Sequence, residues 1–422
     1  MQLLALHEFH HDLGAHFGEE RGMELVNHYS DPPAEHVALR NTAGVLDLSF
    51  RGRLCLMGAD RVRFLHGQVT NDVIRLRIGD GCYAALVTAK GKMQSDLNIY
   101  CLPDELLLDF EPGLSEIISQ RLEKYIIADD VQVVDATPHY GQLSVQGPKA
   151  ESVVRSLDLF PAIPDVPFSF VKVADTTLGE IYLINHARLL PLNPTPAGAG
   201  EAFGLRGQAQ RDPALVDGIE GDCETKAPSP LRSAGALQSG FDLFVPAAAL
   251  SAVADRVIAA ARQSGGQACG WQALETARIE AGIPRFGVDM DETNIPLETG
   301  LENRAVSFNK GCYIGQEVIA RIRTYGQVAK ALRGLRLADD LKPLPAKGDK
   351  LFHAGKEVGY VTSALASPTF KANIALGYVR KEVNQIGTEL TVRMSAGESL
   401  AKIVPLPFES AFEASPGQRL QR

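Results

Sequence analysis

The sequence predicts an α+β protein, in which mixed α/β subdomains are followed by a small C-terminal β-barrel. Residues 51–140 alternate short apolar strands with helical patterns, which is typical of a mixed α/β unit. Residues 334–408 instead consist of short strand-like runs separated by turn signals such as Ala354-Gly355-Lys356. Between them, residues 191–240 hold six prolines among glycine, alanine and polar residues, and no periodic pattern survives there.

These observations divide the chain of 422 residues into a folded region over 1–330, a barrel over 331–410 and a tail over 411–422. We expect residues 51–140 to form a subdomain of the first region. We expect residues 191–240 to be a flexible surface insertion, because a long segment without periodicity does not contribute to a packed core.

Apolar runs and helical periodicity predict the individual elements. Residues 1–50 indicate a helix, a polar loop and a strand, and we expect His7, His10 and His11 on a solvated face of that helix. Further strands are expected at 53–58, 83–88, 97–101, 106–110, 142–148, 168–173, 180–184 and 241–246, and helices at 113–125, 247–263 and 271–281. The barrel strands are expected at 335–337, 351–353, 358–363, 374–379, 390–392 and 403–404.

Composition and charge exclude several classes of protein. Hydrophobic residues make up 45% and the formal net charge is −9, so the chain has enough apolar residues for a core and is too acidic for a general nucleic-acid binder. Its six cysteines form no Cys-x-x-Cys pair, which argues against a metal site and favours a reducing compartment. The sequence shows neither a signal peptide nor an apolar run that could span a membrane, so we expect a cytoplasmic location.

Charge inverts along residues 289–333. A loop without calcium-site spacing comes first, and we expect its four carboxylates to be mostly solvated: Asp289, Asp291, Glu292 and Glu298. Residues 303–333 then hold six basic residues and one acidic residue, Glu317, which is a local charge of +5 in an acidic chain. This excess predicts an anionic ligand or partner nearby, such as a polyglutamylated folate, a tRNA or an acidic protein surface.

The most chemically varied stretch of the chain lies inside this basic region, at residues 309–321. Gly311 and Gly315 permit a tight turn, and apolar residues at four-residue spacing predict a short helix after Gly315. Cys312 then lies just before a helix N-terminus and two residues from Lys310, and both features favour a thiolate. Such a cysteine is a candidate nucleophile, metal ligand or redox centre, although a lone cysteine is more often a small buried hydrophobe.

The stretch from Lys310 to Glu317 reads Lys-Gly-Cys-Tyr-Ile-Gly-Gln-Glu and closely resembles the signature of the folate-binding YgfZ family. That family is related to the glycine-cleavage T-protein (aminomethyltransferase) superfamily, which three further segments resemble: residues 36–49, 142–148 and 277–287. The resemblance covers nearly the whole chain apart from residues 191–240 and the tail. It implies a T-protein-like fold around a central cavity, with tetrahydrofolate or a derivative as the cofactor.

The resemblance also implies roles for individual residues. Cys312 would be the functional thiol, tuned by the cations of Lys310 and Arg321, and Asp96 would assist the folate chemistry at the end of a hairpin. The folate pocket would be lined by Arg278, Glu280, Tyr313, Gln316 and Arg321. Two simpler interpretations remain open, because Arg278 and Glu280 could pair with each other, and Asp96 could be an ordinary polar residue at a strand edge.

One departure from the superfamily bears on the activity. Relatives carry two adjacent aspartates where this chain has Ser95-Asp96, which argues against aminomethyl transfer, because that reaction needs a carboxylate beside the folate nitrogens. Members of the YgfZ family assist assembly or repair of iron–sulfur clusters in selected enzymes, including tRNA-modifying enzymes. The resemblance therefore implies our first hypothesis, a tetrahydrofolate-binding protein that assists assembly or repair of iron–sulfur clusters in such client enzymes.

A single cysteine cannot supply the usual four cluster ligands, so any bound cluster would be shared or transient. The alternatives are an aminomethyltransferase that forms methylene-tetrahydrofolate and a non-catalytic folate-binding scaffold. The expected partners are folate and iron–sulfur client proteins, without direct contact to nucleic acid or membrane.

Overall fold

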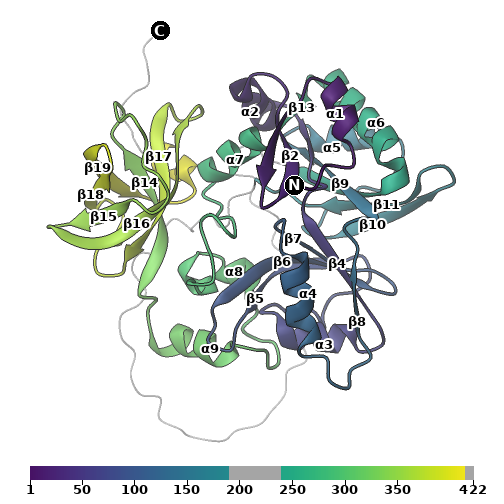
Figure 1. Cartoon of the computed structure of the whole chain (residues 1–422), viewed down its shortest axis with the longest axis horizontal. Helices are drawn as coiled ribbons and strands as arrows, with labels where there is room; N and C mark the ends of the chain where they lie inside the picture. The colour runs from purple at the N-terminus through teal and green to yellow at the C-terminus, as the bar shows by residue number, and fades with distance from the viewer. Residues whose placement is uncertain (190–238, 414–422) are drawn as a thin grey trace, which may run out of the picture.

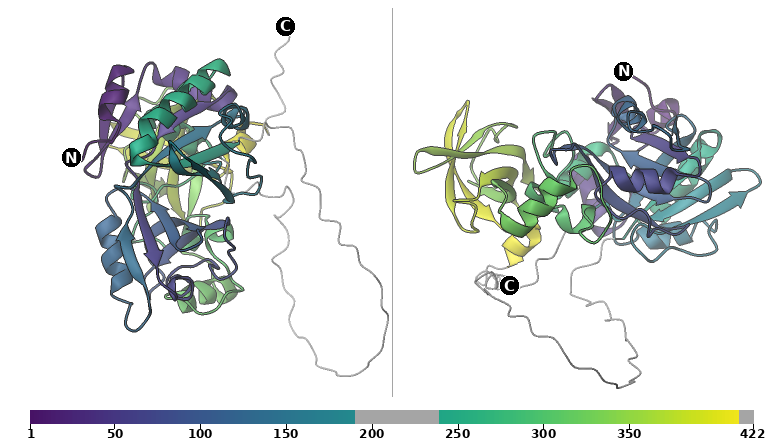
Figure 2. Two further views of the ribbon diagram at one scale, coloured as in Figure 1. Left: turned by 90° about the vertical axis from the view of Figure 1, so that its right-hand side faces the viewer. Right: turned by 90° about the horizontal axis from the view of Figure 1, so that it is seen from below.

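The computed structural model describes residues 1–189 and 239–413, which form three lobes (Figure 1). Two lobes are built on open sheets and the third is a closed barrel at the C-terminal side. The barrel lies at one side of the molecule and the two sheet lobes at the other (Figure 2). The predicted α+β class with a C-terminal barrel is confirmed. The expected insertion at 191–240 falls almost wholly outside the described residues.

The first lobe has a six-stranded sheet in the order β10-β11-β12-β9-β3-β13. Its pairs are antiparallel except for β3 and β13, which are parallel. The bounds of its strands are β3 Gly44–Asp47, β9 Tyr140–Gln146, β10 Phe170–Asp175, β11 Gly179–Asn185, β12 Gly240–Pro246 and β13 Gln267–Ala268. Its helices are α1 His7–Asp12, α2 Pro32–Asn41, α5 Ala150–Arg155, η1 Ala247–Ala249, α6 Leu250–Gln263 and α7 Trp271–Glu280.

The core of this lobe forms because α6 has a regular apolar stripe. Val253, Val257 and Ala261 recur at four-residue spacing, are fully buried, and pack with Leu143 and Leu243 of the sheet. The sequence interpretation missed the hairpin formed by β1 (His16–Glu20) and β2 (Met23–His28), which it assigned to a polar loop.

One histidine of α1 contradicts the expected solvated face. His10 is buried, with Nε2 2.8 Å from Asp47 Oδ2 and Nδ1 2.8 Å from the hydroxyl of Tyr29. The prediction failed because α1 packs against the sheet through a polar residue as well as apolar ones. His11 is exposed, as expected.

The second lobe has a five-stranded antiparallel sheet in the order β5-β6-β7-β4-β8. Its strands are β4 Gly52–Met57, β5 Gly81–Val87, β6 Met93–Cys101, β7 Leu106–Phe110 and β8 Gln132–Asp135. The helices beside it are α3 Arg61–Gln68, α4 Ser115–Glu123, η2 Pro296–Glu298, α8 Glu302–Ala305 and α9 Gln316–Tyr325. The apolar core of this lobe combines residues of the sheet with residues of the helices, such as Leu97 of β6 and Ile319 of α9.

The barrel closes in the order β14-β17-β16-β15-β18-β19. Its strands are β14 Lys330–Leu337, β15 Lys350–His353, β16 Lys356–Ser367, β17 Ala372–Arg380, β18 Glu389–Met394 and β19 Gly397–Val404. Helix α10 (Phe408–Glu413) follows and buries Phe408, so residues 411–413 of the expected tail are helical. Every helix within the described ranges is too short or too polar to cross a bilayer.

Buried carboxylates attach the barrel to the first lobe. Asp289 accepts hydrogen bonds of 2.6 Å from the hydroxyls of Thr362 and Ser363, and its other oxygen lies 2.5 Å from Arg278 Nη1. The expectation of a solvated acidic loop is therefore wrong for Asp289, and also for Glu298, which is buried and accepts from the backbone of residue 295. Both carboxylates can be buried because hydrogen-bond donors surround them.

Candidate active site

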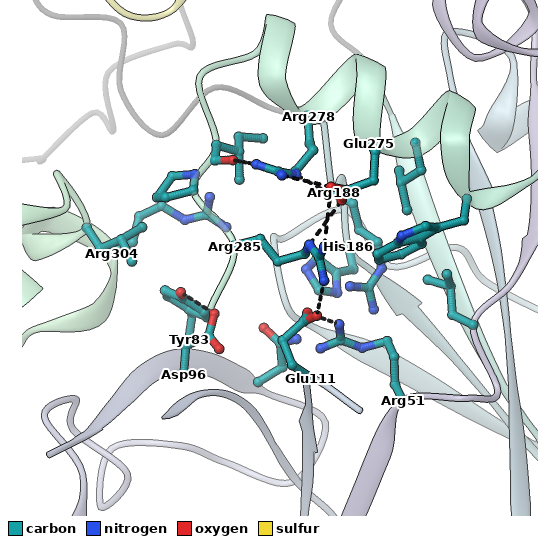
Figure 3. Close-up of a pocket in the computed structure, with 17 residues that line it drawn as sticks. Arg51, Tyr83, Asp96, Glu111, His186, Arg188, Glu275, Arg278, Arg285 and Arg304 are labelled. Carbon is teal, nitrogen blue, oxygen red and sulfur yellow. Dashed lines mark hydrogen bonds and ion pairs between the residues drawn. The ribbon is translucent and has the colours of Figure 1, made fainter. Parts of the chain in front are cut away.

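A cavity with about 780 Å³ of empty space, part of it open to solvent, lies between the two sheet lobes (Figure 3). β5, β6 and the residue after β7 form one wall, and α7 with the loop after it forms another. α8 with the residue before it, the segment after β11 and the segment between β3 and β4 complete the lining. Among the described residues, none from the barrel lines this cavity.

A chain of alternating charges crosses the cavity wall (Figure 3). Arg278 of α7 forms a bidentate contact of 2.7–2.8 Å with Glu275, which lies 3.1 Å from Arg285 Nε. Arg285 also approaches Glu111 to 3.4 Å, and Glu111 accepts from Arg51. Each of these buried or half-buried charges thus lies beside an opposite one, which offsets the cost of removing it from water.

The lower end of this chain is anchored in the second lobe. Arg51 donates from Nε to Asp109 Oδ1 over 2.8 Å, and Asn98 donates to the other oxygen over 2.8 Å. Burial opposes the charge on Arg51, but Asp109 and Glu111 outweigh it and raise the pKa of the guanidinium above its usual value. For the same reason the pKa of Asp109 is lowered, since Arg51 and Arg188 outweigh its burial.

A second balanced group lies at the side of the cavity formed by the first sheet, where His186 and Arg188 line it. Arg188 Nη2 is 2.6 Å from Asp242 Oδ2, and His186 Nδ1 is 2.9 Å from the same oxygen. Ser144 also donates to Asp242. Burial, followed by the charge of Arg188, lowers the pKa of His186, which is therefore neutral at pH 7.

Asp96 differs from the other carboxylates of the wall, because no cation is bonded to it. Its Oδ2 accepts a hydrogen bond of 2.8 Å from the hydroxyl of Tyr83. Its Oδ1 is buried and has no hydrogen-bond partner among the described residues. Burial, followed by the negative charge of Glu111, raises the pKa of Asp96 to about 6. A carboxyl group with this pKa can both hold and release a proton near neutral pH.

The strand geometry of β6 explains why Asp96 faces the cavity and Ser95 does not. Successive side chains of a strand point to opposite faces of its sheet. Asp96 and Asn98 line the cavity. Ser95 and Leu97 are completely buried, and Leu97 belongs to the apolar core of the second lobe. Ser95, which stands where the family resemblance leads us to expect another aspartate, therefore lies on the core side of the sheet.

The structure places the predicted site residues in three different places. Asp96 and Arg278 line the cavity. Glu280 is buried at the barrel contact, where it accepts from His36 Nε2 and Thr369 Oγ1, each over 2.8 Å, and from Ser367. Burial opposes its ionisation, but the hydrogen bonds and charge of His36 outweigh it and lower the pKa of Glu280. The remaining predicted residues lie around the start of α9.

The ammonium group of Lys310 is hydrogen-bonded to the backbone. Its buried ammonium donates to the carbonyl oxygens of His66, Val69 and Asn71 over 2.5–2.8 Å, which uses all three of its protons. Burial lowers its pKa to about 8. Tyr313 is buried beside it, with the ammonium 4.8 Å from the ring centroid.

Cys312 is exposed in the loop before α9, and Arg321 is exposed on that helix. Gly315 precedes the helix with a φ of 85°, a conformation that favours glycine. Gln316 is half-buried in the first turn. The cavity lining includes none of the residues from Lys310 to Arg321.

Several residues of the cavity escaped the sequence interpretation: Arg51, Tyr83, Glu111, Arg188, Glu275, Arg285 and Arg304. One signal was available, since Asp109 interrupts the apolar strand Leu106–Phe110, and a charged residue inside such a run indicates a buried ion pair. The partners themselves lie on segments too distant in sequence for spacing to reveal. Within the described ranges, no group of three or more His, Cys, Asp or Glu side chains could hold a metal ion.

Comparison with known proteins agrees with this architecture. Residues 6–187 and 237–310 match the GCVT N-terminal domain, and residues 330–409 match the glycine cleavage T-protein C-terminal barrel domain. The chain belongs to the glycine cleavage T-protein family. The two parts of the N-terminal match leave out most of the proline-rich segment.

Curated relatives of this family cover the chain almost end to end. An aminomethyltransferase from Geobacillus kaustophilus is 29% identical over 94% of this chain and 95% of its own length. One from Symbiobacterium thermophilum is 28% identical over 96% of each chain. The crystal structure of the glycine cleavage system aminomethyltransferase T from Bartonella henselae has a TM-score of 0.77 at 21% identity, covering 96% of this chain and 98% of that one. This last likeness concerns the fold.

Proteins of the T-protein family bind tetrahydrofolate. That molecule carries N–H donors in its pterin and bridging nitrogens and carboxylates in its glutamate part. The cavity offers an unpartnered buried acceptor, Asp96 Oδ1, and several arginines. The residues of the cavity therefore fit a tetrahydrofolate molecule.

Proposed function

We propose that this protein transfers a one-carbon unit to tetrahydrofolate in the manner of an aminomethyltransferase, with Asp96 as the group that moves the proton. The observation that carries the proposal is the position of Asp96. Its carboxylate faces the cavity, has a free buried oxygen, and has a pKa of about 6. The names of the relatives agree with this activity.

Asp96, Tyr83 and the charged residues of the cavity wall have different tasks in this proposal. Two amine nitrogens of tetrahydrofolate would bond to the methylene carbon of the carrier's aminomethyl group, while the bonds from that carbon to the amino group and to the carrier's sulfur break and release ammonia and a free thiol. Asp96 is mostly ionised at pH 7 and can accept a proton from an N–H group. The hydroxyl of Tyr83 fixes the orientation of its carboxylate over 2.8 Å. The alternating charges from Arg278 to Arg51 hold the wall rigid, so that Asp96 needs little reorganisation when it acts.

The replacement of the neighbouring aspartate by Ser95 does not weigh against this activity. Ser95 points into the core of the second lobe, where it donates to the backbone carbonyl of Asp96 over 2.9 Å. An aspartate at that position would also point away from the cavity. The chain therefore retains the carboxylate that this chemistry uses.

The direct test is an activity assay with tetrahydrofolate and an aminomethylated lipoyl carrier protein, in which turnover is measured as the ammonia released. We expect activity in the wild type and a loss of about 100-fold or more in Asp96→Asn, because general acid–base catalysis contributes about 10²–10⁴-fold. Ser95→Ala is the matched control on the adjacent residue, and it should stay within a few-fold of the wild type. Failure of a folded, folate-binding wild type to turn over would reject the proposal and favour a scaffold.

A second candidate function is supported by Cys312. This thiol is exposed, and it lies in the motif that resembles the YgfZ family. In that function the protein would bind tetrahydrofolate and assist assembly or repair of iron–sulfur clusters in client enzymes, with Cys312 holding iron or sulfur transiently. The exposed Arg321, rather than the buried Lys310, would then act through its charge on the surrounding surface.

Complementation of a strain deficient in cluster maintenance separates the two functions. The accessory function predicts that Cys312→Ala loses rescue while Asp96→Asn with intact folate binding retains it. The transferase function predicts no rescue by any variant, or rescue that does not depend on Cys312. Equal rescue by wild type and Cys312→Ala would remove the thiol from consideration.

A further inference from the structure

We propose that Arg304 anchors a carboxylate of the ligand's glutamate part and thereby selects folates over neutral pterins. The inference rests on the proposed folate function and adds a residue that sets specificity. It follows from the charges around the cavity, from the position of α8, and from the relation of Arg304 to Asp96.

Four of the five arginines that line the cavity are matched by protein carboxylates. Arg51 contacts Asp109 and Glu111. Arg188 contacts Asp242, and Arg278 contacts Glu275 and Asp289. Arg285 lies between Glu275 and Glu111. These guanidinium groups are already occupied, so a ligand gains little by adding a negative charge beside them.

Arg304 is the exception. It forms no ion pair with any carboxylate in residues 1–189 and 239–413, and no dashed line reaches it in Figure 3. Its guanidinium lies instead over two aromatic rings, 5.6 Å from the centroid of Tyr83 and 5.9 Å from that of Phe168. Aromatic faces attract a cation but leave its N–H groups without strong acceptors. A half-buried cation in this state is expected to bind an anion.

The backbone holds Arg304 in place for this task. The side-chain amide of Asn71 donates to the carbonyl of Arg304 over 2.9 Å, and it also donates to the carbonyl of Tyr83 over 2.8 Å. Thr70 donates to the next carbonyl, that of Ala305. The helix α8 is therefore tied to β5, and Arg304 is fixed relative to Tyr83.

Arg304 and Asp96 are both positioned by Tyr83. Arg304 lies over its ring, whereas Asp96 bonds to its hydroxyl. The free cation and the free carboxylate oxygen are thus closer together than the pterin and glutamate ends of an extended folate. A folate that contacts both residues therefore has a carboxylate at Arg304. The group of that folate that lies at Asp96 is then the nitrogens in the middle of the molecule and not the amide edge of its pterin.

The test compares 5-formyltetrahydrofolate with its dimethyl ester, which keeps the pterin and the aminobenzoyl group but carries no carboxylate. Affinities are measured by isothermal titration calorimetry. We expect the wild type to bind the ester at least about tenfold more weakly, because a charge-assisted pair is lost. Arg304→Gln should bind both forms equally, at the level of the wild type with the ester. Arg304→Lys should keep part of the difference.

Two controls keep the result specific. Arg323→Gln removes a neighbouring cation that stacks on Phe308 at 3.6 Å and does not line the cavity, so it should retain the discrimination of the wild type. The Tm of Arg304→Gln should be unchanged or higher, because the substitution removes a cation that is half-buried without a carboxylate partner.

Each outcome decides the matter. If Arg304→Gln binds 5-formyltetrahydrofolate and still prefers it to the ester as strongly as the wild type does, the role of Arg304 as the anchor is overturned while the proposed function stays intact. If Arg304→Gln and Arg304→Lys both bind the two ligands more weakly and both have a lowered Tm, Arg304 is a structural residue, and its role as the anchor is again overturned. If the folded wild type binds neither ligand, the proposed function fails and the anchor fails with it.

Discussion

The cavity wall and the segment from Lys310 to Arg321 both concentrate charged and polar side chains, but they use them differently. In the wall, residues from distant parts of the chain converge, and four of five arginines have carboxylate partners. In the segment, neighbouring residues diverge in space. Lys310 and Tyr313 are buried, whereas Cys312 and Arg321 are exposed.

This difference shows that a dense motif in sequence is not necessarily one site in space. The ammonium of Lys310 ties a loop through three carbonyl oxygens, so it is a structural group. Asp96 has a less distinctive sequence context, yet it faces the cavity with a free oxygen. Function is therefore best sought where polar groups are buried without partners.

The largest expected effect is on the buried ion pairs of the wall. Asp109→Asn removes the charge that balances Arg51, and we expect a loss of about 3–5 kcal/mol in the free energy of unfolding. Chemical denaturation measures it. The matched control is Asp339→Asn, which breaks an exposed pair with Arg336 and should cost less than about 1 kcal/mol. Equal effects of the two substitutions would contradict the contrast between buried and exposed charges.

Next in size is Lys310→Met, which leaves the three carbonyl oxygens without their donor. We expect destabilisation by about 3 kcal/mol, since each buried unsatisfied group costs on the order of 1–3 kcal/mol. The rate at which iodoacetamide alkylates Cys312 should stay within about twofold of the wild type, because the ammonium is engaged elsewhere. A large fall in that rate in the folded variant would restore Lys310 as a group that tunes the thiol.

The third effect appears only over a range of pH and follows from the pKa of Asp96, which burial raises from 3.8 in the unfolded chain to about 6. Between these values the folded state binds more protons at Asp96 than the unfolded state, so the contribution of Asp96 to stability decreases as pH rises from about 4 to 6 and is then constant. The loss attributable to Asp96 should reach at most about 3 kcal/mol, because a pKa difference of one corresponds to about 1.4 kcal/mol. The difference in unfolding free energy between wild type and Asp96→Asn across this range measures it, and a difference independent of pH would refute the raised pKa.

The smallest effect is expected for exposed residues of the segment. Cys312→Ala and Arg321→Ala should each change the free energy of unfolding by less than about 0.5 kcal/mol, because neither side chain is packed. Thermal denaturation in parallel with the Lys310 variant checks this. A loss of several degrees in Tm for either substitution would show that the segment is held together as a unit.

The sequence predicted most of the architecture but only part of the site. Strands such as Leu106–Phe110 and the alanine-rich α6 were visible, because their local patterns agree with their burial. The hairpin of β1 and β2 was not, since polar residues such as Glu19 and Glu24 dominate its pattern. Asp289 appeared solvated because the hydroxyls that bury it belong to Thr362 and Ser363 in another lobe.

Within the site, the residue identities were easier to predict than their directions. Asp96 was predicted from a family resemblance. Successive side chains of a strand alternate between the two faces of its sheet, so once the core face of β6 is known, Asp96 is assigned to the cavity side and Ser95 to the core side. Arg304 and Glu111 could not be paired with any function from sequence. They lie on segments of the second lobe that are far apart in the sequence and meet only when the chain folds.

The most direct test of the central claim is a crystal structure of the protein with 5-formyltetrahydrofolate. Our account predicts density for the ligand in the cavity between the lobes, with nitrogens within hydrogen-bonding distance of Asp96 and a carboxylate at Arg304. Density over Cys312 with the cavity occupied only by water would contradict it.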